Sequence, residues 1–217
     1  MRIPKINVIY SLDKETELFL KFLNNPNRLQ YKKMIFEEHP KLKIAIEEAR
    51  AETMESQRKI VREYLEEFQK DNEEKFIKII NGAEKVFLNK TDSLLRELAK
   101  LMDYEWKDGD SDFTAIPTFL PFCPFEKNTF YFATRTYLNN GRDINDILFT
   151  AAHEISHFVL FKILWGNKMN PDDNLTLQLL QEILAPVLMD QSELAQIIKH
   201  DASNYFGNPD IALLYVN

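Results

Sequence analysis

Hydrophobic positions in the first half of the chain recur at helical spacing. A short β-branched run over residues 5–10 predicts a strand. Beyond it, apolar residues return every three or four positions between charged ones, which is typical of amphipathic helices. Ser11 is a good helix N-cap, and Pro40 suits the first turn of a helix. The predicted helices cover residues 11–23, 26–38, 40–69 (with a weak stretch at 51–59), 73–88 and 91–102.

The period changes near residue 111. Aromatic and β-branched residues fill residues 112–122 and 128–138, with turn residues between them, which predicts two strands. Pro117 would confine the first strand to a sheet edge, because proline has no N–H to donate to a ladder. Helices are then expected over residues 143–165, 175–189 and 192–202, and the apolar tail 208–217 suits a terminal strand.

The two halves also differ in charge. Residues 1–110 carry 21 Lys and Arg and 22 Asp and Glu, whereas residues 111–217 carry 6 and 12. Hydrophobic residues make up 45% of the chain, and no Gly/Ser-rich linker separates the halves. The sequence therefore predicts one compact α+β unit. It would combine a mainly helical N-terminal region (1–110) with a core (111–217) that contains both strands and helices.

Composition excludes several classes of protein. The net charge of −7 argues against nucleic acid as a partner, since phosphate binding requires a basic surface. Cys123 is the only cysteine, so no intramolecular disulfide can form, which fits a reducing compartment. The apolar stretch 147–165 contains ionisable residues that a bilayer would penalise. With no signal peptide recognisable at the N-terminus, we expect a cytoplasmic protein without a membrane span.

The candidate chemistry lies in that apolar stretch, in the sequence "HEISH". His153 and His157 are four residues apart, so their rings share one face of a helix and can bind one zinc ion through neutral nitrogens. Glu154 is rotated by about 100° from His153, where it can take a proton from a zinc-bound water. The simpler alternative is that these are ordinary histidines packed in a core.

A hydrolytic zinc site needs a third protein ligand and an open position. Glu182 is the best candidate, because it is the only charged residue between Leu175 and Met189, in a helix that can return against the first. It could instead belong to a solvated stripe with its neighbouring glutamines. His200 is a second candidate, whereas His39 is expected at the surface of the charged half.

The "HEISH" motif and the downstream Glu182 together resemble the gluzincins, the thermolysin-like zinc metallopeptidases. The resemblance covers about residues 112–190. It implies that His153, His157 and Glu182 bind Zn²⁺ and that Glu154 is the general base. It also implies a small mixed sheet over the active-site helix, whose edge strand binds a peptide or protein substrate in extended form. That edge would be residues 112–119, with 128–137 inside it.

Several points stay open at this stage. Position 186 is proline, where the family often has an aspartate that orients a ligand histidine; Asp146 and Asp190 are possible substitutes. The oxyanion could be stabilised by a residue after Glu182, and the candidates are His200, Tyr205 and Tyr215. Cys123 could bind the zinc and keep the enzyme latent, or be a small apolar residue. Besides the metallopeptidase, two alternatives remain: an inactive or regulatory zinc-binding helical protein acting through partners, and a metal-free helical scaffold. The oligomeric state is not predicted.

Overall fold

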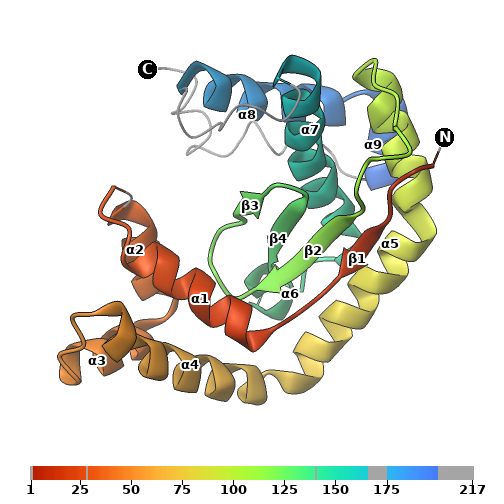
Figure 1. The fold of residues 1–217 in the computed structure, drawn as a ribbon. Coiled ribbons are helices and arrows are strands. Elements are labelled where there is room, and N and C mark those ends of the chain that lie inside the picture. Colours follow the sequence, from red (N-terminus) through yellow and green to blue (C-terminus); the bar gives the residue numbers. More distant parts are fainter. Residues whose placement is uncertain (1, 28, 140, 166–174, 200–217) are drawn as a thin grey trace.

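The computed structural model describes residues 2–27, 29–139, 141–165 and 175–199 of the chain (Figure 1). Helices dominate it, as the sequence predicts. They are α1 (Leu12–Leu23), α2 (Leu29–Glu38), α3 (Pro40–Glu48), α4 (Met54–Asp71), α5 (Glu73–Leu101), α6 (Arg135–Asn139), the 3-10 turn η1 (Ile144–Asp146), α7 (Ile147–Trp165), α8 (Leu175–Met189) and α9 (Ser192–Ile198).

The strands form one mixed sheet in the order β1-β2-β4-β3. β1 (Ile6–Val8), β2 (Phe113–Thr118) and β4 (Thr129–Ala133) are parallel, and β3 (Phe125–Glu126) is antiparallel to β4. A mainly helical chain with a small mixed sheet confirms the predicted α+β class. No helix in the described part of the chain is both long and apolar enough to cross a bilayer.

β2 is an internal strand, so the prediction of an edge strand over residues 112–119 is wrong. It pairs with β1 through Phe113 to Ala115 and with β4 through Thr114 to Thr118. In the alternation of the ladder, the nitrogen of Pro117 faces the β1 side, where β1 has already ended at Val8. The missing N–H therefore costs no hydrogen bond, although the strand is inside the sheet.

Three predicted helices differ in extent from those of the structure. The helix expected over residues 40–69 is broken between α3 and α4, where Arg50 has a φ of 49° and Thr53 and Ser56 form a capping box that starts α4. Conversely, residues 73–88 and 91–102 belong to one helix, α5, because its buried stripe continues without interruption across Asn89 and Lys90.

The second predicted strand is shorter than expected, since β4 ends at Ala133 and α6 follows. β3 was not predicted, because two residues carry no periodic signal. The helix expected from residue 143 begins with η1, where the Asp143 side chain accepts a hydrogen bond from the Asn145 N–H. α9 ends at Ile198, and the strand predicted over residues 208–217 lies outside the described residues.

Helices α1–α4 form an arm beside the sheet, and α5 leads from this arm along the sheet (Figure 1). Three groups of the arm converge on the end of β2. Glu15 Oε1 accepts hydrogen bonds from the Thr118 hydroxyl and the Phe119 N–H, both at 2.8 Å. His39 Nε2 donates to the Phe119 carbonyl at 2.9 Å, which leaves His39 Nδ1 to accept from the Tyr64 hydroxyl at 2.8 Å. We call these groups the Phe119 clamp.

His39 is buried in the Phe119 clamp, so the expectation that it lies at the surface is wrong. Its side chain is only 1% exposed, and its ring packs edge-on against Phe19. The polar bonds to both ring nitrogens compensate its burial, and burial lowers the pKa of His39, so the ring is neutral. Arm, sheet and core are thus joined by a buried polar network as well as by apolar contacts.

Candidate metal centre

The site begins with the composition of α7, which is apolar in nearly every direction. The structure buries it on all sides over residues 147–160, and α7 lies against α8, α5 and β4. Ala151, Ala152 and Ile155 are fully buried around the histidines. As a result, the polar side chains on this helix are withdrawn from water: His153 is 9% exposed, Glu154 6% and His157 1%.

Three potential ligand groups meet between α7 and α8. The rings of His153 and His157 are 4.5 Å apart, as expected one helical turn apart on the same face. Glu182 Oε2 lies 3.4 Å from His153 Nε2, and its Oε1 lies 4.0 Å from His157 Nε2. The ligand atoms of all three residues fall within 4.8 Å of one another. Two zinc ligands in a tetrahedral site are separated by about 3.4 Å, so only a small contraction is required.

Buried polar atoms without hydrogen bonds indicate whether these residues fit a metal ion. Both ring nitrogens of His157 and Glu154 Oε2 are buried without a hydrogen bond of normal geometry, although the Gln181 backbone is close enough to His157 to act to raise its pKa. Leaving such groups unsatisfied costs about 1–3 kcal/mol each, and native structures rarely do so. One cation at the cluster would give His157 Nε2 a partner. The donor set of two imidazoles and one carboxylate is the set that zinc accepts at catalytic sites.

Burial and neighbouring charges shift the pKa values of His153 and His157 in opposite directions. Burial acts to lower the pKa of His153, but the carboxylates of Glu182 and Glu154 outweigh it and raise that pKa. Burial, and then the charge of His153, lower the pKa of His157 to about 3, so this ring is neutral. Burial opposes ionisation of Glu182, but His153 outweighs it and lowers the pKa of that carboxyl. The cluster thus offers an anion and a neutral imidazole, the forms that bind metal ions.

Glu154 lies beside the ligand cluster. Its Oε2 is 3.8 Å from His157 Nδ1, on the opposite side of the ring from Glu182. Desolvation by burial raises the pKa of Glu154 to about 7. A carboxyl group with a pKa near neutrality exchanges protons readily at physiological pH, as a general base must.

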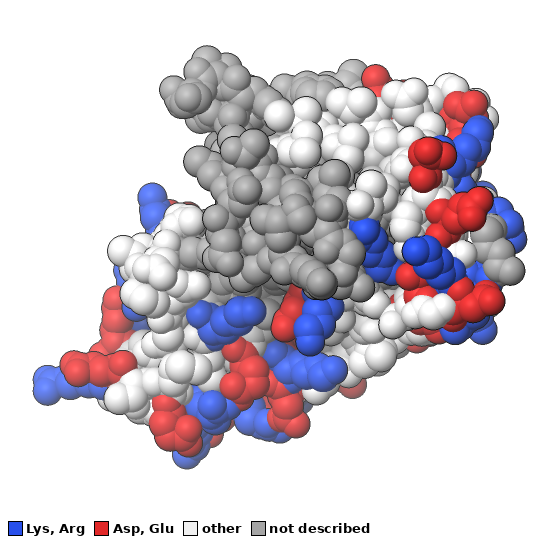
Figure 2. All heavy atoms as spheres, turned by 45° about the horizontal axis from the view of Figure 1, so that its top comes forward, with Lys and Arg blue, Asp and Glu red and all other residues white. Residues whose placement is uncertain are grey.

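The ligand cluster is bordered by apolar side chains on one side and is open to solvent on another. Phe125, on β3, packs edge-on against His157 with ring centroids 5.5 Å apart, and it also contacts Phe158 and Phe161. The Glu182 side chain is 40% exposed, so the cluster reaches solvent on the α8 side. Around α7 and α8 the surface carries few charged groups, whereas charges of both signs mix elsewhere (Figure 2).

The structure brings together His153, His157 and Glu182, with Glu154 adjacent, as the sequence suggested. Asp146 forms an ion pair with Arg142 at 2.7 Å, and no contact of Asp146 or Asp190 with a ligand histidine is seen among the described residues. His200, Tyr205 and Tyr215 lie outside the described residues.

Cys123 is not one of the clustered groups in the described part of the chain. Burial, and then the charge of Glu154, raise the pKa of its thiol to about 12, so the metal-binding thiolate is disfavoured. These observations favour a small, half-buried apolar side chain over a latency ligand.

The Phe119 clamp was not predicted from the sequence. One signal was available, because Glu15 precedes Phe19 by four residues and Phe22 by seven, and so lies on the buried face of α1. A charged residue on an apolar stripe is the same signal that identified Glu182.

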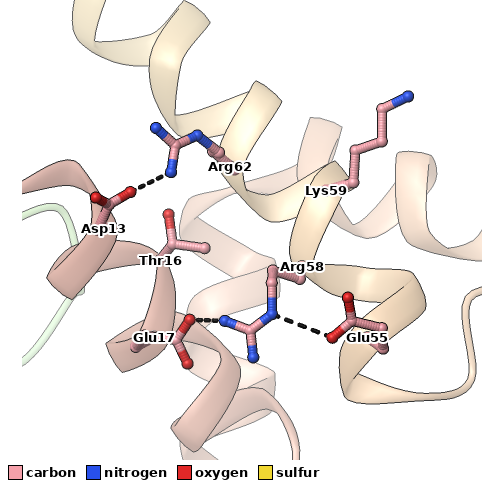
Figure 3. A pocket seen from close by; sticks show the side chains of 7 residues that line it. All are labelled: Asp13, Thr16, Glu17, Glu55, Arg58, Lys59 and Arg62. Atoms are coloured by element: carbon pink, nitrogen blue, oxygen red, sulfur yellow. Dashed lines mark hydrogen bonds and ion pairs between the residues drawn. The ribbon is translucent and has the colours of Figure 1, made fainter.

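Away from the metal centre, a surface depression lies between α1 and α4. It is lined by Asp13, Thr16, Glu17, Glu55, Arg58, Lys59 and Arg62 (Figure 3). Its cations are already paired: Arg58 bonds to Glu17 and Glu55, Arg62 bonds to Asp13, and Lys59 lies 3.7 Å from Glu63. A charge-balanced, exposed network of this kind joins two helices weakly and offers no free charge to an anion.

The chain was compared with known proteins, and no family model, curated protein or solved structure matches it.

Proposed function

We propose that the protein is a zinc-dependent metallopeptidase that hydrolyses peptide bonds of a peptide or protein substrate. The supporting observation is the convergence of His153, His157 and Glu182 from two helices next to a buried carboxyl group. A structural zinc site has no need of Glu154, whereas a hydrolytic one requires a base at this place. The gluzincin resemblance of the sequence leads to the same assignment.

The chain's own residues have defined tasks in this proposal. His153, His157 and Glu182 would hold the ion, which when bound supplies Lewis acidity to a water molecule and to the scissile carbonyl. Glu154 accepts the proton of the attacking water and passes it to the leaving amine. Its apolar surroundings keep its pKa close to the working pH, because ionisation there has no water to stabilise it.

Substrate alignment would fall to β3, the edge strand on the side of His157. The backbone of β3 pairs only with β4 in the described part of the chain, so its outer edge can accept an extended peptide. Phe125 on this strand contacts His157, so a peptide paired there would run past the proposed metal position. This replaces the earlier expectation that β2 is the substrate strand.

The experiment combines metal analysis with a peptide library. Purified protein and the Glu154→Gln variant are loaded with zinc, freed of excess metal, and incubated with the library, and new termini are identified by mass spectrometry. We expect one zinc per chain in both proteins and cleavage by the wild type alone. Equal cleavage by the variant would refute the general-base role of Glu154.

The same experiment separates the alternatives. One zinc per chain with no cleavage in either protein would favour the regulatory zinc-binding protein. Substoichiometric zinc that both proteins lose on dialysis would favour the metal-free scaffold, with His153 and His157 as ordinary core residues.

A further inference from the structure

Gln181 precedes Glu182 on α8 and is buried, with only 5% of the residue exposed. Its side-chain Nε2 donates a hydrogen bond to Glu182 Oε1 at 3.3 Å. The opposite orientation of the amide would place its oxygen against a carboxylate oxygen, so this contact fixes which end of the amide faces Glu182. Glu182 Oε1 is also the oxygen that lies 4.0 Å from His157 Nε2. The amide therefore bonds directly to a group of the metal centre.

The backbone of Gln181 approaches a second ligand of the metal centre. Burial and then the charge of His153 lower the pKa of His157, whereas Glu182 and the Gln181 backbone act to raise it. A backbone group that favours the protonated ring is an acceptor, so the carbonyl of Gln181 faces the imidazole. Metal-binding histidines commonly direct their second ring N–H at a backbone carbonyl, which fixes the orientation of the ring. One residue thus reaches two of the three candidate ligands.

Only one end of the Gln181 amide has a partner. Its Oε1 is buried without a hydrogen bond in the described part of the chain. Such an acceptor is destabilising, and an apolar side chain of similar length would avoid this cost. Gln57 provides the contrast, because it is 6% exposed but its amide donates to the Ala51 carbonyl and accepts from Asn24, both at 2.9 Å. Both ends of the Gln57 amide stabilise the fold, whereas Gln181 contacts a candidate metal ligand with one end.

The Glu182 side chain requires orientation before it can bind a metal ion. It is 40% exposed and flexible, so it loses rotamer freedom when it becomes a ligand. Position 186, where the gluzincin resemblance expects an aspartate that orients a ligand, is proline. A hydrogen bond from a buried amide limits the rotation of the carboxylate in advance, which reduces the entropic cost of binding.

We propose that Gln181 is a positioning residue of the metal centre, which holds the Glu182 carboxylate toward the two histidine rings. The amide improves zinc binding, although its unpaired oxygen lowers the stability of the metal-free protein. The inference rests on the metal centre of the proposed function but not on peptide hydrolysis. Gln181 itself binds neither the ion nor the substrate.

The test is a zinc titration of the metal-free, full-length protein in competition with a chromophoric chelator, for the wild type and for Gln181→Met. Methionine suits a buried site and has a similar length, but it cannot donate a hydrogen bond to Glu182. We expect the zinc dissociation constant to rise about 10–100-fold, the usual effect of removing a group that orients a metal ligand. A dissociation constant within about twofold of the wild type would overturn the proposal.

Denaturant unfolding of the metal-free proteins distinguishes positioning from a structural role. The unfolding midpoint of Gln181→Met should equal or exceed that of the wild type, since an unpaired acceptor is removed and the exposed Glu182 can bond to water. Gln57→Met is the matched control, whose midpoint should fall because two hydrogen bonds are lost, while its zinc affinity stays within about twofold.

A lower midpoint for Gln181→Met together with unchanged zinc affinity would assign Gln181 to the fold instead. Gln181→Leu is the second variant, which also lacks a donor. If neither variant folds without zinc, Gln181 is a structural residue and the proposal is wrong.

Cobalt in place of zinc reports the geometry of the site. The visible absorption of bound Co²⁺ depends on the arrangement of its ligands. At saturating Co²⁺, the spectrum of Gln181→Met should differ from that of the wild type in band position or intensity, and the spectrum of Gln57→Met should not. Identical spectra for all three proteins would contradict a role of Gln181 in orienting Glu182.

These measurements separate the inference from the proposed hydrolysis. Zinc affinity that depends on Gln181, in a protein that cleaves no peptide, would support the positioning role and count against the metallopeptidase. Peptide cleavage with equal zinc affinity in the wild type and Gln181→Met would do the reverse. A wild-type protein that binds no zinc would refute both.

Discussion

Two carboxyl groups of this protein are buried to a similar degree, and each has an Oε2 atom without a hydrogen-bond partner, but their surroundings differ. Glu15 in the Phe119 clamp and Glu154 in the metal centre are 1% and 6% exposed, and burial raises the pKa of each to about 7. Glu15 receives two hydrogen bonds from the chain itself. Glu154 Oε2 receives none and faces His157, whose ring nitrogens also lack hydrogen bonds of normal geometry.

The difference shows how a structural site and a candidate reaction site can be told apart without a ligand. In the clamp, Glu15 Oε1 accepts two hydrogen bonds and both nitrogens of His39 have partners, so that Glu15 Oε2 is the one clamp atom that is buried without a partner among the described residues. In the metal centre, several adjacent buried atoms lack partners at one place, which the chain tolerates where something else binds. Substitutions should therefore act on stability in the clamp and on ligand-dependent properties in the metal centre.

The largest effect is expected from Glu154→Gln on hydrolysis. The amide cannot accept the proton of the attacking water, so the cleavage rate should fall by about 10²–10⁴-fold or more, the contribution typical of general acid–base catalysis. The peptide-cleavage rate and the zinc content of the same sample are the measurements. Zinc content should not change, and a variant that loses zinc would show that Glu154 is needed to hold the metal.

Removal of a ligand should abolish stabilisation by zinc. At a zinc concentration 100-fold above the dissociation constant, binding to the native state alone stabilises by about 2.7 kcal/mol. Thermal unfolding with and without zinc should show this gain for the wild type and not for His157→Ala. Glu15→Gln serves as the matched variant that keeps the gain. A zinc-dependent shift that survives in His157→Ala would place the ion elsewhere.

The pH dependence of stability should separate the clamp from the metal centre. The Glu15 pKa rises from its ordinary value of 4.5 to about 7 on folding, so the native state binds this proton more tightly. Its contribution to stability is therefore complete below pH 4.5, falls as the pH rises to 7, and stays low above that, a loss of about 3 kcal/mol.

Glu15→Gln keeps an acceptor oxygen for Thr118 and Phe119 but cannot ionise. In denaturant unfolding it should be more stable than the wild type at pH 8, and the difference should shrink to near zero at pH 4. The same difference at both pH values would mean that Glu15 is not buried as a titrating group.

The smallest effect is expected from Tyr64→Phe, which removes only the hydroxyl that donates to His39 Nδ1. One neutral hydrogen bond contributes about 1 kcal/mol to the free energy of unfolding. Denaturant unfolding measures it, and zinc affinity should be unaltered. A change in zinc affinity would show that the clamp and the candidate metal centre are coupled, whereas we expect substitutions in the clamp to alter stability alone.

Much of the helical architecture and the centre of the site could be predicted from local patterns. The spacing of His153 and His157 fixes their shared face, and the isolation of Glu182 in an apolar helix marks it as a residue that requires a partner. The N-cap at Ser11 was correctly identified from the side chain itself.

What could not be predicted depends on contacts between distant segments. The position of β2 inside the sheet follows from β1, more than 100 residues earlier, and Pro117 is tolerated only because β1 ends early. His39 was misplaced because its partners, Tyr64 and Phe119, are 25 and 80 residues away. The continuity of α5 was misjudged because tertiary burial outweighs weak local propensity, whereas the break before α4 overlaps residues 51–59, where the sequence allowed a kink or a solvated turn.

The most direct test is an anomalous difference map at the zinc absorption edge, from a crystal grown with one equivalent of zinc. The account predicts a single strong peak between His153 Nε2, His157 Nε2 and the Glu182 carboxylate, about 2.0–2.1 Å from each ligand atom. Glu154 should lie beside the ion without binding it. A well-ordered cluster with no peak, or a peak bound by Cys123 or other residues, would contradict the proposed metal centre.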